Sequence, residues 1–544
     1  MVARFPGAEK VRHSATALVA DMASDPYGLI SPSIYETARV VTLARSLAGH
    51  WERVRYLLAS QHRDGHWGEL PGYELVPTLS ATEALLSSSR RSTDENRTAV
   101  SRRDVVHGAS RGLRALRGRL GTAAPETIPD TVAAEIVIPA LVAEINKHLD
   151  RLGPEPTAGL EDWRGIQLGL PQGADDRLLA RLHEAVRLER PLSPKLWHSF
   201  EAMGASAQGT SIVRPVRGAV GCSPAATAAW LGNGQADADS RLSVEYLEAV
   251  QERSGGPVPV CAPVPVFERV WVLAALITAG VGLSVPDELV EDLHAAFGEF
   301  GVAGGPGLPP DSDDTSTALY VLARLGRPRS ADCLWSYQDG GHFSCFPDER
   351  TSSTTTNAHV LRALGEYLAL DSLRRQRYLA AMDEISAWLR DQQQVDGSWR
   401  DKWHASSYYA TAQCAVALAR YGGAASAAVV SKAVAWVLST QRLDGAWGVW
   451  TGTQEETAYA VQILLLAAPS ATDDSLVRAA ARGCTFLLRS DASATPFPPL
   501  WHDKDLYTPV RVVRAERLSA LYLGYADPRV AQMIMASDAE QQVW

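Results

Sequence analysis

The sequence predicts an all-α fold, and three observations support this prediction. Apolar residues recur at helical spacing through most of the 544 residues. Alternation of apolar and polar residues, which would indicate half-buried strands, is nearly absent. A short Gln-Trp pattern returns several times, each time between two helical segments. Repeated helix pairs with short turns stack into an α-solenoid or close into an α/α barrel.

The helical segments come in two groups along the chain. The clearest of them span residues 34–47, 133–149, 457–468 and 510–524. The polar stretch 88–130 has the composition of an exposed connection, and the glycine-rich stretch 301–310 (GVAGGPGLPP) marks a second break. Because the repeats lie towards both ends with a less regular middle, we expect two helical domains.

The composition favours a globular protein of the cytoplasm, as a monomer or homodimer. The formal net charge of −10 and the scattered Lys and Arg argue against nucleic acid as a partner. Six cysteines are spread singly without a Cys-x-x-Cys pair, as expected of reduced thiols. The opening MVARFPGAEKVRH lacks the apolar run of a signal peptide, and no stretch approaches a membrane span.

The Gln-Trp repeat has a simple structural interpretation. QHRDGHWG begins at Gln61, QQVDGSW at Gln393 and QRLDGAWG at Gln441, and degenerate copies begin at Gln338 and Gln251. In each full copy Asp-Gly supplies a turn with positive φ, and the Trp then folds back onto the neighbouring helices. We interpret these Trp residues as packing staples that report architecture and carry no chemistry.

The stretch LPPDSDDTSTALYVL (308–322) places three carboxylates at the start of a predicted helix. Two prolines suit helix entry, and a single aspartate is enough to cap the helix. The three charges of Asp311, Asp313 and Asp314 repel one another, and partial burial then raises at least one pKa. A carboxyl that stays protonated at neutral pH can act as a general acid. A solvated helix cap is the alternative.

Several blocks, taken in order with this motif, resemble the class II terpene cyclases, and more narrowly the bacterial copalyl and halimadienyl diphosphate synthases. The blocks are SIYETARVV (33–41), RDGHWG (63–68), SPAATAAWL (223–231), STTTNAHVLRAL (353–364), GSWRDKWHASSYYATA (397–412), EETAYAVQ (455–462) and LWHDKDLYTP (500–509). The resemblance covers nearly the whole chain. It implies two α/α-barrel domains of the terpene cyclase and protein prenyltransferase toroid type. In this scheme residues 1–50 begin the β domain, 51–295 form the inserted γ domain, and 296–544 complete the β domain with the acidic motif.

The activity implied by the resemblance is protonation-initiated cyclisation of geranylgeranyl diphosphate to a bicyclic, labdane-type (copalyl-like) diphosphate. Asp313 matches the family's general acid, and Asp311 and Asp314 would orient it or return its proton. Asn357 matches the asparagine that hydrogen-bonds this acid, although a helix cap is its alternative role.

The cation formed in such a reaction needs aromatic faces, and the last proton needs a base. The aromatic candidates are Trp197, Trp271, Phe343, Tyr408 and Tyr409. His198 in SPKLWHSFEAMG falls on the histidine that assists proton removal in the plant enzymes. Val260 stands where those enzymes have its asparagine partner, so a satisfied pocket or core histidine is an equal alternative for His198.

The diphosphate would be held by cationic side chains and Mg²⁺. Lys402, Lys504 and Arg400 fall in blocks that resemble diphosphate-binding segments, with a solvated surface charge as the alternative for each. Glu126 and Asp130 stand where the family has an acidic stretch linked to Mg²⁺.

The sequence lacks the motif that ionises a prenyl diphosphate. DDRLL (175–179) and DDSLV (473–477) both lack the last acid of Asp-Asp-x-x-Asp. We therefore expect the product to keep its diphosphate and to pass to a downstream class I terpene synthase. The alternatives are a farnesyl diphosphate cyclase with a drimenyl-type product, a squalene-hopene-type triterpene cyclase, an α/α-barrel glycoside hydrolase and a non-enzymatic helical scaffold.

Overall fold

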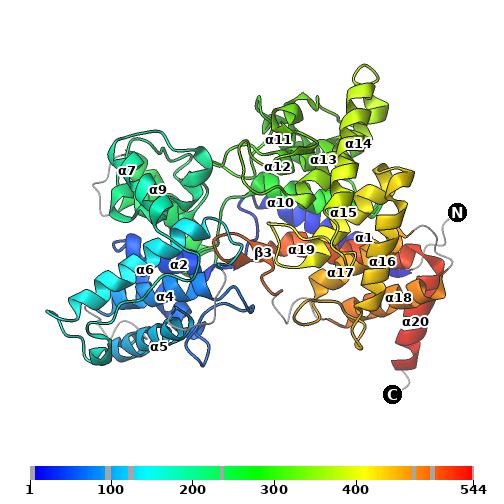
Figure 1. Ribbon diagram of the computed structural model, residues 1–544. Coiled ribbons are helices and arrows are strands. Elements are labelled where there is room, and N and C mark those ends of the chain that lie inside the picture. The colour runs from blue at the N-terminus through cyan, green and yellow to red at the C-terminus, as the bar shows by residue number, and fades with distance from the viewer. Residues whose placement is uncertain are drawn as a thin grey trace.

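The structure is a computed structural model that describes residues 6–91, 100–120, 128–232, 238–468, 473–490 and 497–541. The chain forms two helical lobes with a short β-hairpin between them (Figure 1). This confirms the predicted all-α fold. Among the described residues, no helix is both long and apolar enough to cross a membrane.

The large lobe is built on a closed ring of six helices, in which each helix contacts the next and the last contacts the first. The ring helices are α10 (Pro265–Thr278), α12 (Ser312–Arg324), α13 (Thr354–Leu370), α15 (Ser407–Tyr421), α17 (Gln454–Gln462) and α19 (Val510–Ala526). The other elements of this lobe are α1 (Pro6–Ser24), α11 (Asp287–Ala295), η3 (Asp332–Tyr337), α14 (Arg375–Asp391), η4 (Ala424–Ser426), α16 (Ala427–Ser439), η5 (Ile463–Ala467), α18 (Asp474–Arg489) and α20 (Pro528–Gln541).

The ring helices run parallel and begin at the same end of the ring. Several outer helices connect one ring helix to the next, so that the chain returns to the same end each time. Contacts between first turns agree with this arrangement: Arg511 of α19 donates to Glu268 of α10 at 2.9 Å, and His404, just before α15, contacts Glu455 of α17 at 3.2 Å. This end of the ring faces the small lobe.

The small lobe repeats the design with a second closed ring of α2 (Ile34–Leu43), α4 (Leu75–Ser88), α6 (Ala134–Arg151), η2 (Pro194–Ala207) and α8 (Pro224–Leu231). Its other elements are α3 (His50–Ala59), α5 (Arg102–Leu120), η1 (Glu161–Trp163), α7 (Arg177–Arg187) and α9 (Ala238–Glu252). The small lobe is therefore inserted between α1 and α10 of the large lobe.

The lobe boundaries lie near residues 30 and 263, whereas the resemblance placed them at 50 and 295. Tyr35, Ala38 and Val41 of α2 belong to the core of the small lobe. Val270 and Leu273 of α10 belong to the core of the large lobe, which places α10 in the large-lobe ring. The difference arises because each ring needs these helices to close, and ring closure depends on contacts between distant segments.

The Gln-Trp repeats are packing staples, as interpreted from the sequence. The three Trp side chains are fully buried, and each indole N–H donates to a carbonyl ten residues earlier, in the preceding helix. These pairs are Trp67 with Leu57 (2.7 Å), Trp399 with Leu389 (2.8 Å) and Trp447 with Val437 (2.7 Å). Each Trp backbone N–H donates to a threonine hydroxyl of the next ring helix, so every staple joins two helices.

Two short antiparallel hairpins interrupt the helices of the large lobe. The degenerate repeat at Gln338 forms one of them, in which β1 (Gln338–Asp339) pairs with β2 (His342–Phe343). The other pairs β3 (Trp501–His502) with β4 (Leu506–Tyr507) and lies between the lobes (Figure 1). Its loop, residues 503–505, inserts into the small lobe.

Candidate active site

The three predicted carboxyls meet at the first turn of α12. Asp311 is the N-cap, and its Oδ1 accepts a hydrogen bond from the backbone N–H of Asp314 at 2.7 Å. The exposed fractions of Asp311, Asp313 and Asp314 are 6%, 8% and 8%. This burial excludes the solvated-cap alternative, in which the carboxylates would face water.

Two of these carboxyls favour the protonated form. Burial raises the pKa of Asp311 well above its usual value, and the charges of Asp314 and Asp313 add to the effect. Burial also raises the pKa of Asp314 to about 7. In the described part of the structure, Oδ1 of Asp314 has no hydrogen-bond partner, although it is buried. Proton-bearing acids therefore exist at this helix end near neutral pH.

Asp313 makes a direct contact that the sequence interpretation missed. Its Oδ1 lies 2.6 Å from Nδ1 of His359, one turn into α13. Nε2 of the same ring lies 3.2 Å from Oε1 of Gln413 on α15. His359 is inside the block STTTNAHVLRAL, two residues after the residue chosen from it. The sequence signal was the spacing of His359 and Arg362, which puts two polar side chains on one face of this helix.

The predicted hydrogen bond between Asn357 and Asp313 is wrong for this structure. The Nδ2 group of Asn357 donates to the carbonyls of Phe343 (2.9 Å) and Ser353 (2.8 Å), and its Oδ1 accepts from the backbone N–H of Phe343 (2.8 Å). Both amide hydrogens are therefore engaged, and none is left for the acid. Asn357 fixes the β2 hairpin against α13.

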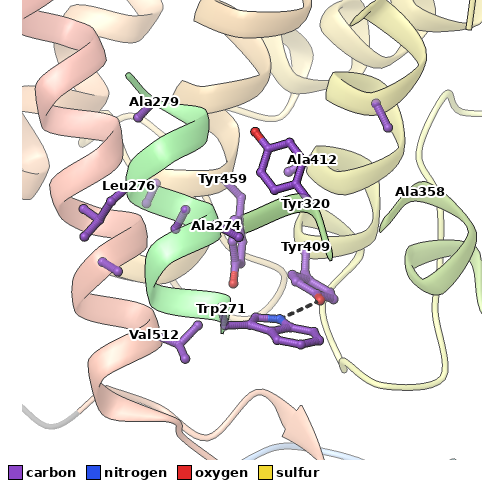
Figure 2. Close-up of a cluster of buried hydrophobic side chains, with 14 of the residues drawn as sticks. Trp271, Ala274, Leu276, Ala279, Tyr320, Ala358, Tyr409, Ala412, Tyr459 and Val512 are labelled. Carbon is purple, nitrogen blue, oxygen red and sulfur yellow. Dashed lines mark hydrogen bonds between the residues drawn. The ribbon is translucent and has the colours of Figure 1, made fainter. Parts of the chain in front are cut away.

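Two of the predicted aromatic residues lie beside the acid–histidine pair. Trp271 meets the His359 ring edge-on with 5.5 Å between centroids, and its indole N–H donates to the hydroxyl of Tyr409 at 3.3 Å (Figure 2). Trp501 and Phe267, which the sequence did not single out, extend this aromatic wall. Trp501 lies 4.9 Å from Tyr409, and Phe267 lies 4.9 Å from Trp271.

The other three predicted aromatic residues lie in ordinary packing positions. Trp197 packs against the core of the small lobe. Phe343 is buried beside Trp335 of η3 with 6.0 Å between ring centroids. Tyr408 points outward from the ring against Trp436 of α16, at 4.5 Å.

The surroundings of His198 favour its protonated, cationic form, which cannot act as a base. Its Nδ1 lies 2.7 Å from the carbonyl of Gly221, and its Nε2 lies 3.0 Å from Oδ1 of Asp503. Both partners accept hydrogen bonds, so both ring nitrogens carry hydrogen. Burial alone would lower the pKa of His198, but the Asp503 carboxylate raises it above its usual value. This corrects the predicted terminating base, and the alternative of a satisfied histidine fits.

Lys504 does not reach a diphosphate site, contrary to prediction. Its side chain is fully buried inside the small lobe. Its Nζ contacts the carboxylate of Glu36, the carboxylate of Glu201 at 3.1 Å, the carbonyl of His198 at 2.7 Å and the hydroxyl of Ser223 at 2.9 Å. Three ammonium hydrogens meet four acceptors, so the lysine ties the hairpin to the small lobe.

Lys402 and Arg400 lie on the loop between α14 and α15, at the end of the ring that faces the small lobe. Nζ of Lys402 lies 2.5 Å from Oε2 of Glu349 and 2.7 Å from the carbonyl of Thr351. Arg400 is exposed. The Lys402 side chain is only 15% exposed and is already paired with Glu349, whereas Arg400 is accessible; the predicted diphosphate role of both stays a prediction.

The described residues do not form a protein cage for a metal ion, since they contain no cluster of three or more His, Cys, Asp and Glu side chains suited to one. Glu126 lies outside the described residues. Asp130 lies at the surface, where the protein on its inner side and the charge of Asp401 raise its pKa. Mg²⁺ commonly takes one or two protein carboxylates and completes its shell with phosphate oxygens and water. A single carboxylate such as Asp130 is compatible with that mode of binding, and the role of Mg²⁺ stays a prediction.

The comparisons with known proteins agree with this geometry. Residues 348–505 match the squalene-hopene cyclase C-terminal domain. The chain is 46% identical over 514 residues to the ent-copalyl diphosphate synthase of Streptomyces sp. strain KO-3988, a match that covers 94% of this chain and 96% of that protein. It is 42% identical over 518 residues to the copalyl diphosphate synthase of Streptomyces cyslabdanicus, covering 94% and 95%.

A solved structure shows the same architecture. The ent-copalyl diphosphate synthase from Streptomyces platensis superimposes with a TM-score of 0.89 at 47% identity, and the match covers 95% of this chain and 99% of that one. The two-ring fold, the buried acids at α12 and these similarities lead to one conclusion: the chain belongs to the family of the bacterial copalyl diphosphate synthases, which are class II terpene cyclases.

Proposed function

We propose that this protein is a class II diterpene cyclase that converts geranylgeranyl diphosphate to a bicyclic, labdane-type diphosphate. The buried Asp313–His359 contact at the start of α12 supports this most strongly. Proton donation to an alkene, a very weak base, needs an acid that is positioned and shielded from water. The names of the Streptomyces relatives supply the copalyl diphosphate product class.

The first step moves one proton from Asp313 to carbon. The O–H bond of the Asp313 carboxyl breaks, and a C–H bond forms at the terminal alkene of the prenyl chain. The π electrons of that alkene form the new bond, which leaves a tertiary cation and the Asp313 carboxylate. Successive alkenes then attack the cation to close two rings, and loss of a proton from carbon ends the reaction, so the net change is an isomerisation.

Trp271 and Tyr409 are the residues that we propose to face the cation. Their rings lie beside the acid, and an aromatic face attracts a cation without forming a bond to it. Because His198 is itself protonated, we propose that water, and not this histidine, carries away the last proton.

The diphosphate keeps its bond to carbon throughout. We propose that Lys402 and Arg400 hold it at the ring end that faces the small lobe, and that Asp130 contacts a Mg²⁺ ion that arrives with it. When bound, Mg²⁺ supplies charge neutralisation. A product that retains a diphosphate suits consumption by a separate class I terpene synthase.

Purified protein should be incubated with geranylgeranyl or farnesyl diphosphate, each with Mg²⁺ and with a chelator. Products are dephosphorylated and identified by gas chromatography–mass spectrometry. We expect a bicyclic C20 alcohol, and Asp313→Ala should lower turnover by about a thousandfold or more because it removes the proton donor. Chelation should raise KM.

A matched control is Asp391→Ala, since Asp391 is an exposed aspartate at the end of an outer helix. This variant should turn over like the wild type. A C15 product from farnesyl diphosphate with no turnover of the C20 substrate would overturn the substrate assignment. Hydrocarbon formed without phosphatase would overturn retention of the diphosphate.

A further inference from the structure

A line of hydrogen bonds continues beyond His359 and ends at an arginine. Oε1 of Gln413 lies 3.2 Å from Nε2 of His359 and also accepts from Nη1 of Arg362 at 3.0 Å. The Arg362 guanidinium is buried, donates through Nη2 to the hydroxyl of Thr278, and lies 4.4 Å from the centroid of the Tyr320 ring. The position of Arg362 is therefore set from α10 and α12 as well as from its own helix.

This geometry selects one tautomer of His359. An amide oxygen can only accept, so Nε2 of His359 must carry the hydrogen in its contact with Gln413. In a neutral imidazole the other nitrogen, Nδ1, then presents its lone pair to Asp313. In this neutral tautomer the proton in the 2.6 Å contact is the one on the Asp313 carboxyl.

Arg362 has two effects on this arrangement. Its N–H groups fix the orientation of the Gln413 amide, because a flipped amide would set its NH₂ group against the guanidinium. Its positive charge also opposes a second positive charge on the His359 ring nearby. The carboxyl–imidazole pair is thus favoured over a carboxylate–imidazolium pair.

The other ionisable groups around the pair lie on α12 itself and on α19. Asp311 and Asp314 lie on α12 with Asp313, and burial and mutual repulsion favour their protonated forms. Glu516 of α19 lines the same cavity as His359, Arg362 and Gln413, and it accepts from the amide of Gln462 at 2.6 Å. Burial raises the pKa of Glu516 to about 7, although the Arg362 charge opposes this rise.

We propose that Gln413 and Arg362 are positioning residues, which hold His359 as the neutral Nε2–H tautomer so that Asp313 carries the acidic proton. This inference rests on the proposed function, since it explains how the general acid of that reaction is kept protonated. Both residues act through His359.

The first test reads the tautomer directly, without substrate. Protein with ¹⁵N-labelled histidine is examined by imidazole ¹⁵N NMR, and the His359 signals among the 13 histidines are assigned by their loss in His359→Phe. The expected result is a protonated Nε2 and an unprotonated Nδ1. A wild-type ring with hydrogen on Nδ1, whether neutral or cationic, would overturn the proposal.

The second test changes the side chains that hold His359. Gln413→Glu places a carboxylate against Nε2 and stabilises the imidazolium, so both ring nitrogens should carry hydrogen and kcat should fall at least about tenfold with little change in KM. Arg362→Gln should lower kcat by less than Gln413→Glu does and should shift the pH dependence of kcat. Unfolding midpoints of both variants show whether they are folded.

Two results separate this proposal from the proposed function. If wild-type protein fails to turn over geranylgeranyl diphosphate, the function is wrong, while the NMR spectrum still reports the tautomer. If turnover is normal and Gln413→Glu keeps both the wild-type kcat and the wild-type ring state, the positioning role is wrong and the function stands.

Discussion

At the scale of residues, three aspartates within four positions have three different environments. Asp311 caps α12, Asp313 contacts a histidine, and Asp314 has a buried oxygen without a hydrogen-bond partner in the described part of the chain. The geometry therefore separates helix capping from proton donation. It also makes Asp314, like Asp311, a carboxyl whose ionisation opposes folding.

The ionisation of Asp314 should appear in the pH dependence of stability. Its pKa is about 7 in the folded state, against 3.8 for an ordinary aspartate. The unfolded chain therefore loses this proton first, and stability falls as pH rises between these two values. Asp314→Asn cannot ionise, so its free energy of unfolding relative to wild type should rise by about 2 kcal/mol from about pH 5.5 to about pH 7.

Denaturant unfolding at the two pH values measures this difference. Asp391→Asn, at an exposed position, serves as the control for introducing one amide. A wild-type minus Asp314→Asn difference that is the same at both pH values would show that Asp314 is already ionised in the folded protein.

The sequence predicted the acids but not their partner, and the reason is geometric. The charge repulsion of Asp311, Asp313 and Asp314 is visible in the local sequence. Which residue of α13 faces them depends on the rotation of that helix about its axis. Asn357 and His359 stand 200° apart on an ideal helix, at about 100° per residue, so only one of them can face α12.

At the scale of elements, the Trp staples explain why short helices assemble into closed rings. Each Trp donates to the helix before it through the indole and to the helix after it through its backbone N–H. The glycine two residues earlier adopts a positive φ, 99° for Gly397, and makes the tight turn possible. The turn and the folding back of the Trp were predictable because Gln, Asp-Gly and Trp are neighbours in the sequence, whereas the hydrogen bond to Thr411, twelve residues later, was not.

Removal of one staple should destabilise the large lobe strongly. Trp399→Ala deletes a fully buried indole and its hydrogen bond to Leu389, and we expect a loss of about 3–5 kcal/mol in the free energy of unfolding. Val395→Ala is the matched control, because Val395 is fully exposed in the same turn and should change stability by less than about 0.5 kcal/mol. Similar losses for the two variants in denaturant unfolding would contradict the staple interpretation.

At the scale of the whole molecule, the β3–β4 hairpin joins the two lobes. His502 contacts the hydroxyl of Tyr73 at 3.1 Å, Asp503 pairs with His198, and Asp505 accepts from the hydroxyl of Ser33 at 2.8 Å. Lys504 stands between the carboxylates of Glu36 and Glu201. The prediction of this lysine as a diphosphate ligand failed because its burial comes from packing against residues some 300 to 470 positions earlier.

Lys504→Met should leave Glu36 and Glu201 buried without their cation and should cost about 3–5 kcal/mol of stability. The triple variant Lys504→Met, Glu36→Gln, Glu201→Gln removes the unpaired charges and should recover much of that loss. Thermal unfolding of the three proteins measures this. If Lys504→Met instead raised KM for the substrate and left stability unchanged, Lys504 would be a diphosphate ligand after all.

Because the six ring helices are parallel and begin at the same end, their helix dipoles point the same way. Each helix N-terminus carries a partial positive charge of about half a unit, and six of them converge on the mouth that faces the small lobe. Such a mouth attracts an anion, so it suits the diphosphate end of a prenyl chain. Asp313 lies in the first turn of α12 at this same end, so the field also stabilises the carboxylate that proton donation leaves behind.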